Sequence, residues 1–213
     1  MPARVLTIAQ QKGGSGKTTL AAHLAIAWSL AGHKVALVDI DPQASLMAWD
    51  RMRAERGEKA APLDIRAVTG WRLASESERL ARDHDIVLVD SPAHDEGEAR
   101  FAIRAADLVI VPMQPSPVDF WATQATLDLA RREVRPALVV LNRVPARANL
   151  VGKIRQKIGE AGARLAATTI GNRVALAGSL IDGEGIGEAE PSSTAAKEIA
   201  ALAEEILRTP GRR

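Results

Sequence analysis

A glycine-rich stretch near the start of the chain, QKGGSGKTT at positions 11–19, has residue types and spacing that suit phosphate binding. Its glycines let the backbone turn tightly, so that successive N–H groups can point at phosphate oxygens. We expect Lys17 to reach the β- and γ-phosphates of a nucleotide and Thr18 to offer its hydroxyl to Mg²⁺. The N-terminus of the helix expected next adds its positive dipole end. The residues assigned to nucleotide binding here are Gly13, Gly14, Ser15, Gly16, Lys17, Thr18 and Thr19.

Two features separate this loop from the usual pattern G-x-x-x-x-G-K-[ST]. Gln11 stands where the first glycine belongs, and a second lysine, Lys12, precedes Lys17 by five residues. A second cation on one phosphate loop either acts on phosphate or is merely solvated. The residues alone leave both possibilities open.

Carboxylates follow two later apolar runs. VDIDPQAS places Asp39 and Asp41 at the end of one run, and DIVLVDSP places Asp90 at the end of another. Because the carboxyl ends of parallel strands meet at one edge of a sheet, these side chains can approach the phosphate loop. Asp90 is of the kind that anchors magnesium in phosphate-loop enzymes. We expect Asp39 to act chemically, whereas Asp41 could also cap a helix that begins near Ser45.

Short apolar runs alternate with helical spacing along the chain, and several runs are continuous, as in strands buried on both faces. The expected strands are Val5–Ala9, Val35–Asp39, Asp64–Val68, Ile86–Asp90, Leu108–Pro112, Ala137–Asn142 and a weaker one near Leu165–Ile170. The expected helices are Thr18–Ala31, Ser45–Arg56, Trp71–Arg82, Glu96–Ala106, Val118–Arg132, Leu150–Ala161 and Ser192–Leu207, and residues 181–193 are expected to be irregular. This alternation predicts an α/β fold with a doubly wound, mostly parallel sheet flanked by helices, in a single domain over residues 1–213.

The composition excludes several kinds of site. The chain has no cysteine, which removes disulfides, thiolate metal sites and Cys-bound iron–sulfur clusters. It has no tyrosine and only 3% aromatic residues, so we expect an aliphatic core. No apolar run is long enough to span a membrane and the first residues lack an apolar signal core, so we expect a cytoplasmic protein.

Charge is distributed unevenly, although the net charge is only +2. Residues 131–173 contain ten basic and two acidic residues, a local charge of +8. Residues 182–205 contain seven acidic residues and one lysine, a local charge of −6. The basic stretch could bind a polyanion such as DNA. Alternatively, the two stretches are solvated helix faces that cancel in three dimensions.

Four segments, KGGSGKTT, DIDPQAS, IVLVDSP and VPMQPSPVDFWA, together resemble the ParA/MinD superfamily of deviant Walker A ATPases, which have a P-loop NTPase fold. SLIDGEGIGE resembles a segment of the short ParA-type partition ATPases, which lack an operator-binding domain. The resemblance covers essentially the whole chain. It implies ATP and Mg²⁺ as cofactors and an ATP-dependent homodimer, in which Lys12 crosses the interface to phosphates bound by the partner subunit. A cation placed there stabilises transition-state charge, as an arginine finger does.

The same resemblance implies roles for single residues. Catalysis is assigned to Lys12, Lys17 and Asp39, the last as the residue that positions or activates the attacking water. The metal is assigned to Thr18 and, through water, to Asp90. A nucleotide-responsive switch is assigned to Asp41, Pro42 and Gln43. Asn142 resembles a base-recognition position, although an asparagine there is often a turn former. The segment SPAHDEGE departs from the family pattern, so we expect an exposed polar loop rather than catalysis for His94, Asp95 and Glu96.

Several branches of the superfamily fit poorly. The absence of cysteine argues against members like the nitrogenase iron protein and arsenite pumps, and the absence of tyrosine argues against the bacterial tyrosine kinases. The C-terminal segment TAAKEIAALAEEILR has a largely acidic polar face and an Ala-rich apolar face, unlike the basic, bulkier helices that bind membranes. We expect this helix to pack on the sheet.

We therefore expect a weakly active ATPase, stimulated by an adaptor of ParB or analogous type, that binds DNA non-specifically and positions a cargo on the nucleoid rather than at a membrane. The DNA-binding candidates are Arg147, Lys153, Arg155, Lys157 and Arg173. Two alternatives remain: a small-molecule ligase resembling dethiobiotin synthetase, and a MinD-like membrane-associated regulator. The sequence leaves the cargo open among plasmid, chromosome and protein complex.

Overall fold

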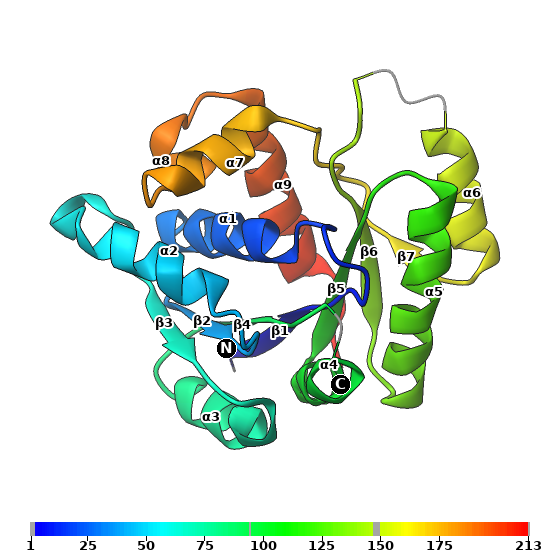
Figure 1. Cartoon of the computed structure of the whole chain (residues 1–213), viewed down its shortest axis with the longest axis horizontal. Coiled ribbons are helices and arrows are strands. Elements are labelled where there is room, and N and C mark those ends of the chain that lie inside the picture. The colour runs from blue at the N-terminus through cyan, green and yellow to red at the C-terminus, as the bar shows by residue number, and fades with distance from the viewer. Residues whose placement is uncertain (1–2, 94, 147–149, 213) are drawn as a thin grey trace.

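A seven-stranded sheet forms the centre of the molecule (Figure 1). The computed structural model describes residues 3–93, 95–146 and 150–212. The strands lie in the order β3-β2-β4-β1-β5-β6-β7, and every neighbouring pair is parallel. Their bounds are β1 Arg4–Ile8, β2 Val35–Asp39, β3 Asp64–Ala67, β4 Ile86–Asp90, β5 Leu108–Met113, β6 Ala137–Leu141 and β7 Arg164–Leu165. The predicted parallel, doubly wound sheet is confirmed.

Helices cover both faces of this sheet (Figure 1). One face carries α1 Lys17–Leu30, α2 Ser45–Ala54, α7 Val174–Ile181, α8 Ile186–Ala189 and α9 Thr194–Arg208. The other face carries α3 Leu73–Leu80, α4 Glu96–Ala105, α5 Pro117–Arg132 and α6 Val151–Glu160. Two short 3₁₀ helices are η1 Gly57–Lys59 and η2 Gly70–Arg72. Within the described ranges, every helix falls short of the length and apolar character needed to cross a membrane.

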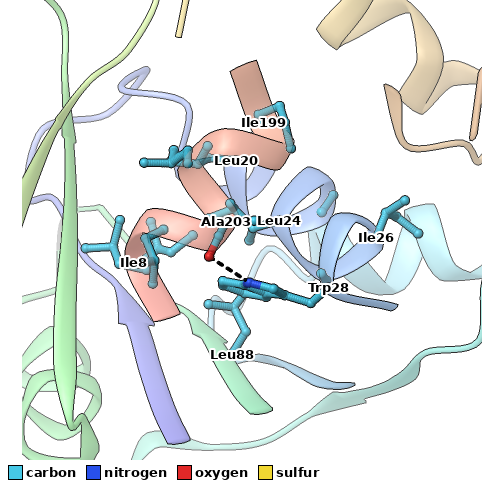
Figure 2. Packing of buried hydrophobic residues seen from close by; sticks show 14 of the residues in the cluster. Ile8, Leu20, Leu24, Ile26, Trp28, Leu88, Ile199 and Ala203 are labelled. Carbon is cyan, nitrogen blue, oxygen red and sulfur yellow. Dashed lines mark hydrogen bonds between the residues drawn. The ribbon is translucent and has the colours of Figure 1, made fainter. Parts of the chain in front are cut away.

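The cores are aliphatic and lie on both sides of the sheet, because successive residues of a strand point to opposite faces. Leu88 of β4 and Ile8 of β1 pack beneath α1 and α9 in the larger core (Figure 2). Trp28 of α1 is buried there, and its indole N–H donates to the carbonyl of Ala203 in α9 at 3.1 Å. The prediction that the C-terminal helix packs on the sheet is therefore confirmed.

The segment before the C-terminal helix is more regular than the sequence predicted. The expectation of irregular structure at residues 181–193 is wrong in part, because α8 lies within it, and α7 was not predicted. Three glycines in this segment lower its helix propensity, so local sequence conceals the short helix. Tertiary contacts hold it instead: the Glu188 carboxylate accepts the N–H groups of Gly185 and Ala61, both at 2.7 Å, and pairs with the buried Arg53 at 2.8 Å.

The weaker strand expected near residues 165–170 is also shorter than predicted, since β7 covers only Arg164–Leu165. The N–H of Ala166 still donates to the Val139 carbonyl of β6 at 2.8 Å, but a side chain of α9 accepts the two N–H groups that follow. The Glu205 carboxylate accepts the N–H of Ala167 at 2.7 Å and that of Thr168 at 2.9 Å. A side chain of a distant helix thus ends this edge strand.

Candidate nucleotide-binding site

The predicted phosphate loop connects β1 to α1 at the carboxyl edge of the sheet. Gly14 and Gly16 have φ angles of 75° and 88°, in the left-handed region that glycine adopts readily. A Cβ on Gly16 would also lie 2.6 Å from the Asn142 amide nitrogen, so two constraints require glycine there. Gly16 is the N-cap of α1 and supplies no side-chain cap, which leaves the first-turn N–H groups available to an anion.

Gln10 anchors this loop to α5, a contact that the sequence did not suggest. Its amide nitrogen donates to the Thr123 hydroxyl at 2.9 Å, and its amide oxygen accepts from the Thr126 hydroxyl at 3.2 Å. The same oxygen accepts the backbone N–H of Lys12 at 3.3 Å. Gln10 and both threonines are buried. These contacts fix where the loop begins.

Lys17 lies across the loop, as the phosphate-binding role requires. Its Nζ donates to the Gln10 carbonyl at 3.0 Å and the residue is only 7% exposed. Burial lowers the pKa of Lys17, while the charges of Asp90 and Asp41 raise it. A buried ammonium that makes one hydrogen bond has donors left for phosphate oxygens.

Asp90 and Thr18 meet as predicted for a metal site. The Thr18 hydroxyl donates to Asp90 Oδ2 at 2.6 Å, whereas Oδ1 is buried and has no hydrogen-bond partner in the described part of the chain. Burial raises the pKa of Asp90 to about 7, and the charge of Asp39 adds to this rise, while the hydrogen bond from Thr18 and the charge of Lys17 lower it. A buried carboxylate oxygen without a partner has a strong need for a cation or a water.

The residues present therefore fit a nucleotide with Mg²⁺. Among the described residues, no group of three or more His, Asp or Glu side chains could hold a metal ion by itself. Mg²⁺ prefers to keep several waters and to bind through one or two protein ligands together with substrate phosphates. Thr18 supplies such a ligand, and Asp90 stands where it can hold a metal-bound water.

Asp39 has a structural role that its predicted chemistry did not include. Its Oδ1 accepts the N–H of Asp41 at 2.9 Å, and its Oδ2 accepts the N–H of Leu46 in α2 at 3.0 Å. Burial raises the pKa of Asp39, and the two backbone N–H bonds lower it. Asp39 therefore accepts an N–H group in the first turn of α2, which is the capping role that the sequence suggested for Asp41.

The predicted switch residues form an exposed turn between β2 and α2. Asp41 Oδ1 accepts the N–H of Gln43 at 2.9 Å, and Pro42 lies exposed between them. Ala44 follows with a φ angle of 51°, outside the region that alanine prefers. Asp39 thus holds the start of this turn by a hydrogen bond, and the backbone of Ala44 at its end is strained.

Lys12, the second lysine of the loop, is held in a salt bridge rather than free in solvent. Its Nζ lies 2.9 Å from Asp119 Oδ1 of α5, and the two side chains are 34% and 7% exposed. Asp119 also accepts from the hydroxyl of Ser116, the N-cap of α5. The sequence analysis missed Asp119, because 107 positions separate it from Lys12.

Comparison with known proteins also indicates a nucleotide-binding domain. Residues 6–186 match the family described as CobQ/CobB/MinD/ParA nucleotide binding domain. The chain belongs to this family. It is 27% identical over 210 residues to maintenance of carboxysome distribution protein A of Halothiobacillus neapolitanus, an alignment that covers 95% of each chain. It is 29% identical over 240 residues to the chromosome-partitioning ATPase Soj of Thermus thermophilus, covering 96% of this chain and 95% of Soj.

The fold is similarly shared with solved structures. A complex of Cyanothece McdA with ATP superposes with a TM-score of 0.77 at 18% identity, covering 97% of each chain. At this level of identity the likeness concerns the fold alone. The superfamily and the fold class expected from the sequence are both confirmed.

In this member of the CobQ/CobB/MinD/ParA family, a hollow of about 270 Å³ lies beside the start of α1. Asn142, the expected base-recognition residue, lines it, but its amide nitrogen donates to the Ser15 carbonyl at 2.9 Å and its oxygen accepts the N–H of Arg143 at 3.0 Å. Asn142 therefore braces the phosphate loop in this structure. Arg143 donates in turn to the Gly14 carbonyl at 3.0 Å. The sequence analysis gave no role to Arg143.

His23 forms the inner wall of the same hollow. Its Nε2 lies 2.8 Å from the Leu176 carbonyl, and its Nδ1 accepts the N–H of Ile186 at 3.1 Å. Burial lowers the pKa of His23 to about 4. The ring is therefore neutral at physiological pH, carries its proton on Nε2, and ties α1 to α7 and α8.

The structure divides the DNA-binding candidates of this family member. Lys153 and Lys157 lie four residues apart on the exposed side of α6, and Lys157 also pairs with Glu160 at 3.2 Å. Arg155 lies on the half-buried side, near Glu205. Arg173 lines the hollow beside α1 and donates to Glu198 at 3.0 Å. Arg147 lies outside the described residues.

The acidic stretch thus partly neutralises the basic one. Glu198 and Glu205 of α9 belong to the acidic stretch, and they lie beside Arg173 and Arg155 of the basic stretch.

The segment for which the sequence predicted an exposed polar loop lies at the start of α4. Asp95 is the N-cap of α4 and accepts the N–H of Glu98 at 2.9 Å, and Glu96 begins the helix. Both fit the expectation of a polar surface, whereas His94 lies outside the described residues.

Proposed function

We propose that this chain is an ATPase that dimerises when it binds ATP and Mg²⁺, binds DNA without sequence preference and positions a cargo together with an adaptor protein. The observation that carries the proposal is the second lysine. Lys12 stands at the rim of the phosphate loop, a third exposed, on a salt bridge that can open outward. Proteins similar to the chain over nearly its full length are named for carboxysome distribution and chromosome partitioning.

The residues of the loop account for ATP binding within one subunit. The first-turn N–H groups of α1 and the Nζ of Lys17 bind the phosphates, while the hydroxyl of Thr18 and, through water, Asp90 hold the metal. When bound, Mg²⁺ neutralises phosphate charge. Each Asp39 oxygen accepts one of these backbone N–H groups and keeps a further lone pair that can orient a water. Because the same carboxylate holds the N–H of Asp41, a shift of Asp39 toward that water would alter the turn at Pro42 and Gln43, which makes the turn responsive to nucleotide.

Lys12 accounts for the requirement for two subunits. In one subunit it is held by Asp119 at 2.9 Å. Lys12 is a third exposed, whereas Asp119 is buried and keeps the hydrogen bond from the Ser116 hydroxyl when Lys12 leaves, so a bound triphosphate of a second subunit can compete for the lysine. We include an adaptor, a nucleoid location and a cargo because the chain is similar to proteins named for carboxysome distribution and chromosome partitioning.

The test measures assembly and turnover together. Multi-angle light scattering with ATP and Mg²⁺ should show a dimer, and without nucleotide a monomer. Lys17→Ala should lose ATP binding and therefore dimerisation. DNA should raise neither assembly nor turnover in that variant.

Two other outcomes would contradict the proposal. Rapid steady turnover by a monomer, without DNA or adaptor, would indicate a small-molecule ligase. ATP-dependent sedimentation with liposomes of anionic lipid, without DNA binding, would indicate a membrane-associated regulator.

A further inference from the structure

The helices α3 and α4 lie on the face of the sheet opposite α1 (Figure 1). A groove runs between them. Its volume is about 600 Å³, and its floor is formed by small side chains such as Ala74, Ala81 and Ala105, with Val5 of β1 beneath. From Trp71 to Ala81 the wall is ten residues long, about 15 Å at the rise of a helix. The groove is therefore elongated rather than round.

Two aromatic side chains stand uncovered at one end. Trp71 of η2 is 72% exposed and Phe101 of α4 is 44% exposed, although the chain has only six aromatic residues in all. Large aromatic groups left exposed beside a hollow are typical of surfaces that bind another protein. The guanidinium of Arg72 lies over the Trp71 ring at 5.8 Å.

Three arginines line the same groove. Arg104, Arg135 and Arg212 all line the groove, and among the described residues that line it Glu78 alone is acidic. Arg135 donates twice to the Arg104 carbonyl, at 3.0 and 2.6 Å, which fixes its guanidinium beside α4. Burial lowers the pKa of Arg135, and the charges of Arg212 and Arg104 lower it further, while Asp107 and Glu133 raise it. The groove therefore carries an excess of positive charge.

A buried polar group in the wall has no partner within the described structure. Ser77 of α3 is 4% exposed, lines the groove, and its hydroxyl makes no hydrogen bond. The hydroxyl oxygen is shielded from solvent, so a ligand would reach it after rotation of the Ser77 side chain, which the missing hydrogen bond favours. Ser77 belongs to α3, the helix that forms one wall.

We propose that the groove between α3 and α4 binds an acidic segment of a partner protein, with a large apolar side chain between Trp71 and Phe101 and carboxylates at Arg104, Arg135 and Arg212. Arginine binds carboxylate through paired N–H groups, and tryptophan and arginine dominate the binding energy of many interfaces. The groove is long enough for about three helical turns or four to five extended residues. It lies on the other face of the sheet from α1, so a partner can occupy it while nucleotide is bound.

The test selects the ligand by chemistry. A phage-displayed library of random 12-residue peptides is panned on the full chain. It is then counter-selected on the double variant Trp71→Ser with Arg104→Glu. Enriched peptides should be acidic and carry one large apolar residue. Binding of a synthetic enriched peptide, measured by fluorescence polarisation, should weaken more than about tenfold in each single variant, as expected for interface hot spots.

Matched controls separate the groove from general effects. Trp121→Ser removes a tryptophan that is 66% exposed on α5, and Arg51→Glu reverses an arginine in the last turn of α2, as Arg104 is in the last turn of α4. Both controls should bind the peptide within about twofold of the unaltered chain. In the Trp121→Phe background Trp71 is the exposed tryptophan, and its emission should shift to the blue when peptide binds.

The proposal is overturned if panning enriches no peptide that depends on the groove, or if enriched peptides are basic or neutral. Equal weakening by Arg51→Glu and Arg104→Glu would also overturn it, because it would show a general effect of net charge. Circular dichroism and ATP binding by each variant establish that a loss of peptide binding is not a loss of fold.

Discussion

At the scale of single residues, the Lys12–Asp119 pair controls access to a second subunit in the proposed mechanism. Asp119→Asn keeps an acceptor for the Ser116 hydroxyl but removes the charge that holds Lys12. We expect it to strengthen dimerisation with a non-hydrolysable ATP analogue by up to about fivefold, the equivalent of about 1 kcal/mol. Analytical ultracentrifugation measures the dissociation constant.

The control is Asp128→Asn, which removes the partner of Arg131 on the same helix and should leave the dimer unchanged. Lys12→Ala should weaken the dimer while the monomer still binds nucleotide. If Asp119→Asn instead weakened the dimer, the pair would be part of the assembled interface rather than a competitor of it.

The raised pKa of Asp90 predicts that the free energy of unfolding depends on pH. Its pKa is raised by burial to about 7 from an ordinary value of 3.8, so between these values the folded chain binds more protons than the unfolded chain. This contribution to the free energy of unfolding is therefore present at low pH and is lost as pH rises through about 7. The Asp90→Asn side chain is neutral at every pH, so the free energy of unfolding of this variant does not fall in this way. Without nucleotide, the stability of the variant relative to the unaltered chain should rise from pH 5 to pH 8, as measured by urea denaturation. Parallel pH curves would show that Asp90 does not titrate in this range.

At the scale of elements, the segment that joins α7 to α8 depends on close backbone contact. Gly183 has a φ angle of 69°, and a Cβ there would lie 2.7 Å from the backbone carbon of Met52 in α2. Arg53, the next residue, donates to the Gly183 carbonyl at 3.0 Å and pairs with Glu188, both side chains being buried. This arrangement explains physically why the segment contains glycines and a glutamate at these positions.

Gly183→Ala should therefore lower the free energy of unfolding by about 1–3 kcal/mol, because neither backbone can move without breaking the contact. Gly178→Ala is the matched control, since it lies inside α7 with open space around its Cβ. Alanine should stabilise the helix there by about 0.5–1 kcal/mol. Urea denaturation measures both changes, and similar stabilities for the two variants would refute the close contact.

At the scale of the whole molecule, the proposed DNA binding would depend on which charges remain exposed after packing. Lys153 and Lys157 face solvent on α6, whereas Arg155 and Arg173 lie near acidic residues of α9. In a dimer the exposed α6 charges are present twice, so their effect on affinity multiplies. Lys153→Glu with Lys157→Glu should weaken binding to any duplex by more than about tenfold and should flatten its salt dependence.

Fluorescence anisotropy with two unrelated duplexes at two salt concentrations measures this effect. Arg51→Glu with Lys59→Glu changes the net charge equally at the α2–η1 region and is the control. Equal losses from the two double variants would indicate that net charge alone decides binding. Preference for one duplex would indicate sequence-specific binding.

Local sequence patterns were enough to predict the parallel sheet and the residues of the phosphate site. Val35–Asp39 and Ile86–Asp90 are strands with the predicted bounds, because continuous apolar runs can be buried only between two helix layers. Since parallel strands place their carboxyl ends together, local sequence was enough to bring Asp39, Asp90 and Thr18 to one edge.

The contacts of these residues could not be predicted from local sequence and depend on how the elements pack. Asp39 binds the backbone of the turn and of α2, Lys12 binds Asp119, and Arg173 binds Glu198. Each contact except the first joins residues far apart in the sequence, and long charged side chains can reach several partners from one backbone position. Hydrophobic periodicity sets which face of an element is buried, but it does not specify which elements meet or where their charges fall. For this reason, three features could be recognised only once the packing was known: the groove, the anchoring of the loop by Gln10, and the pairing of the two charged stretches.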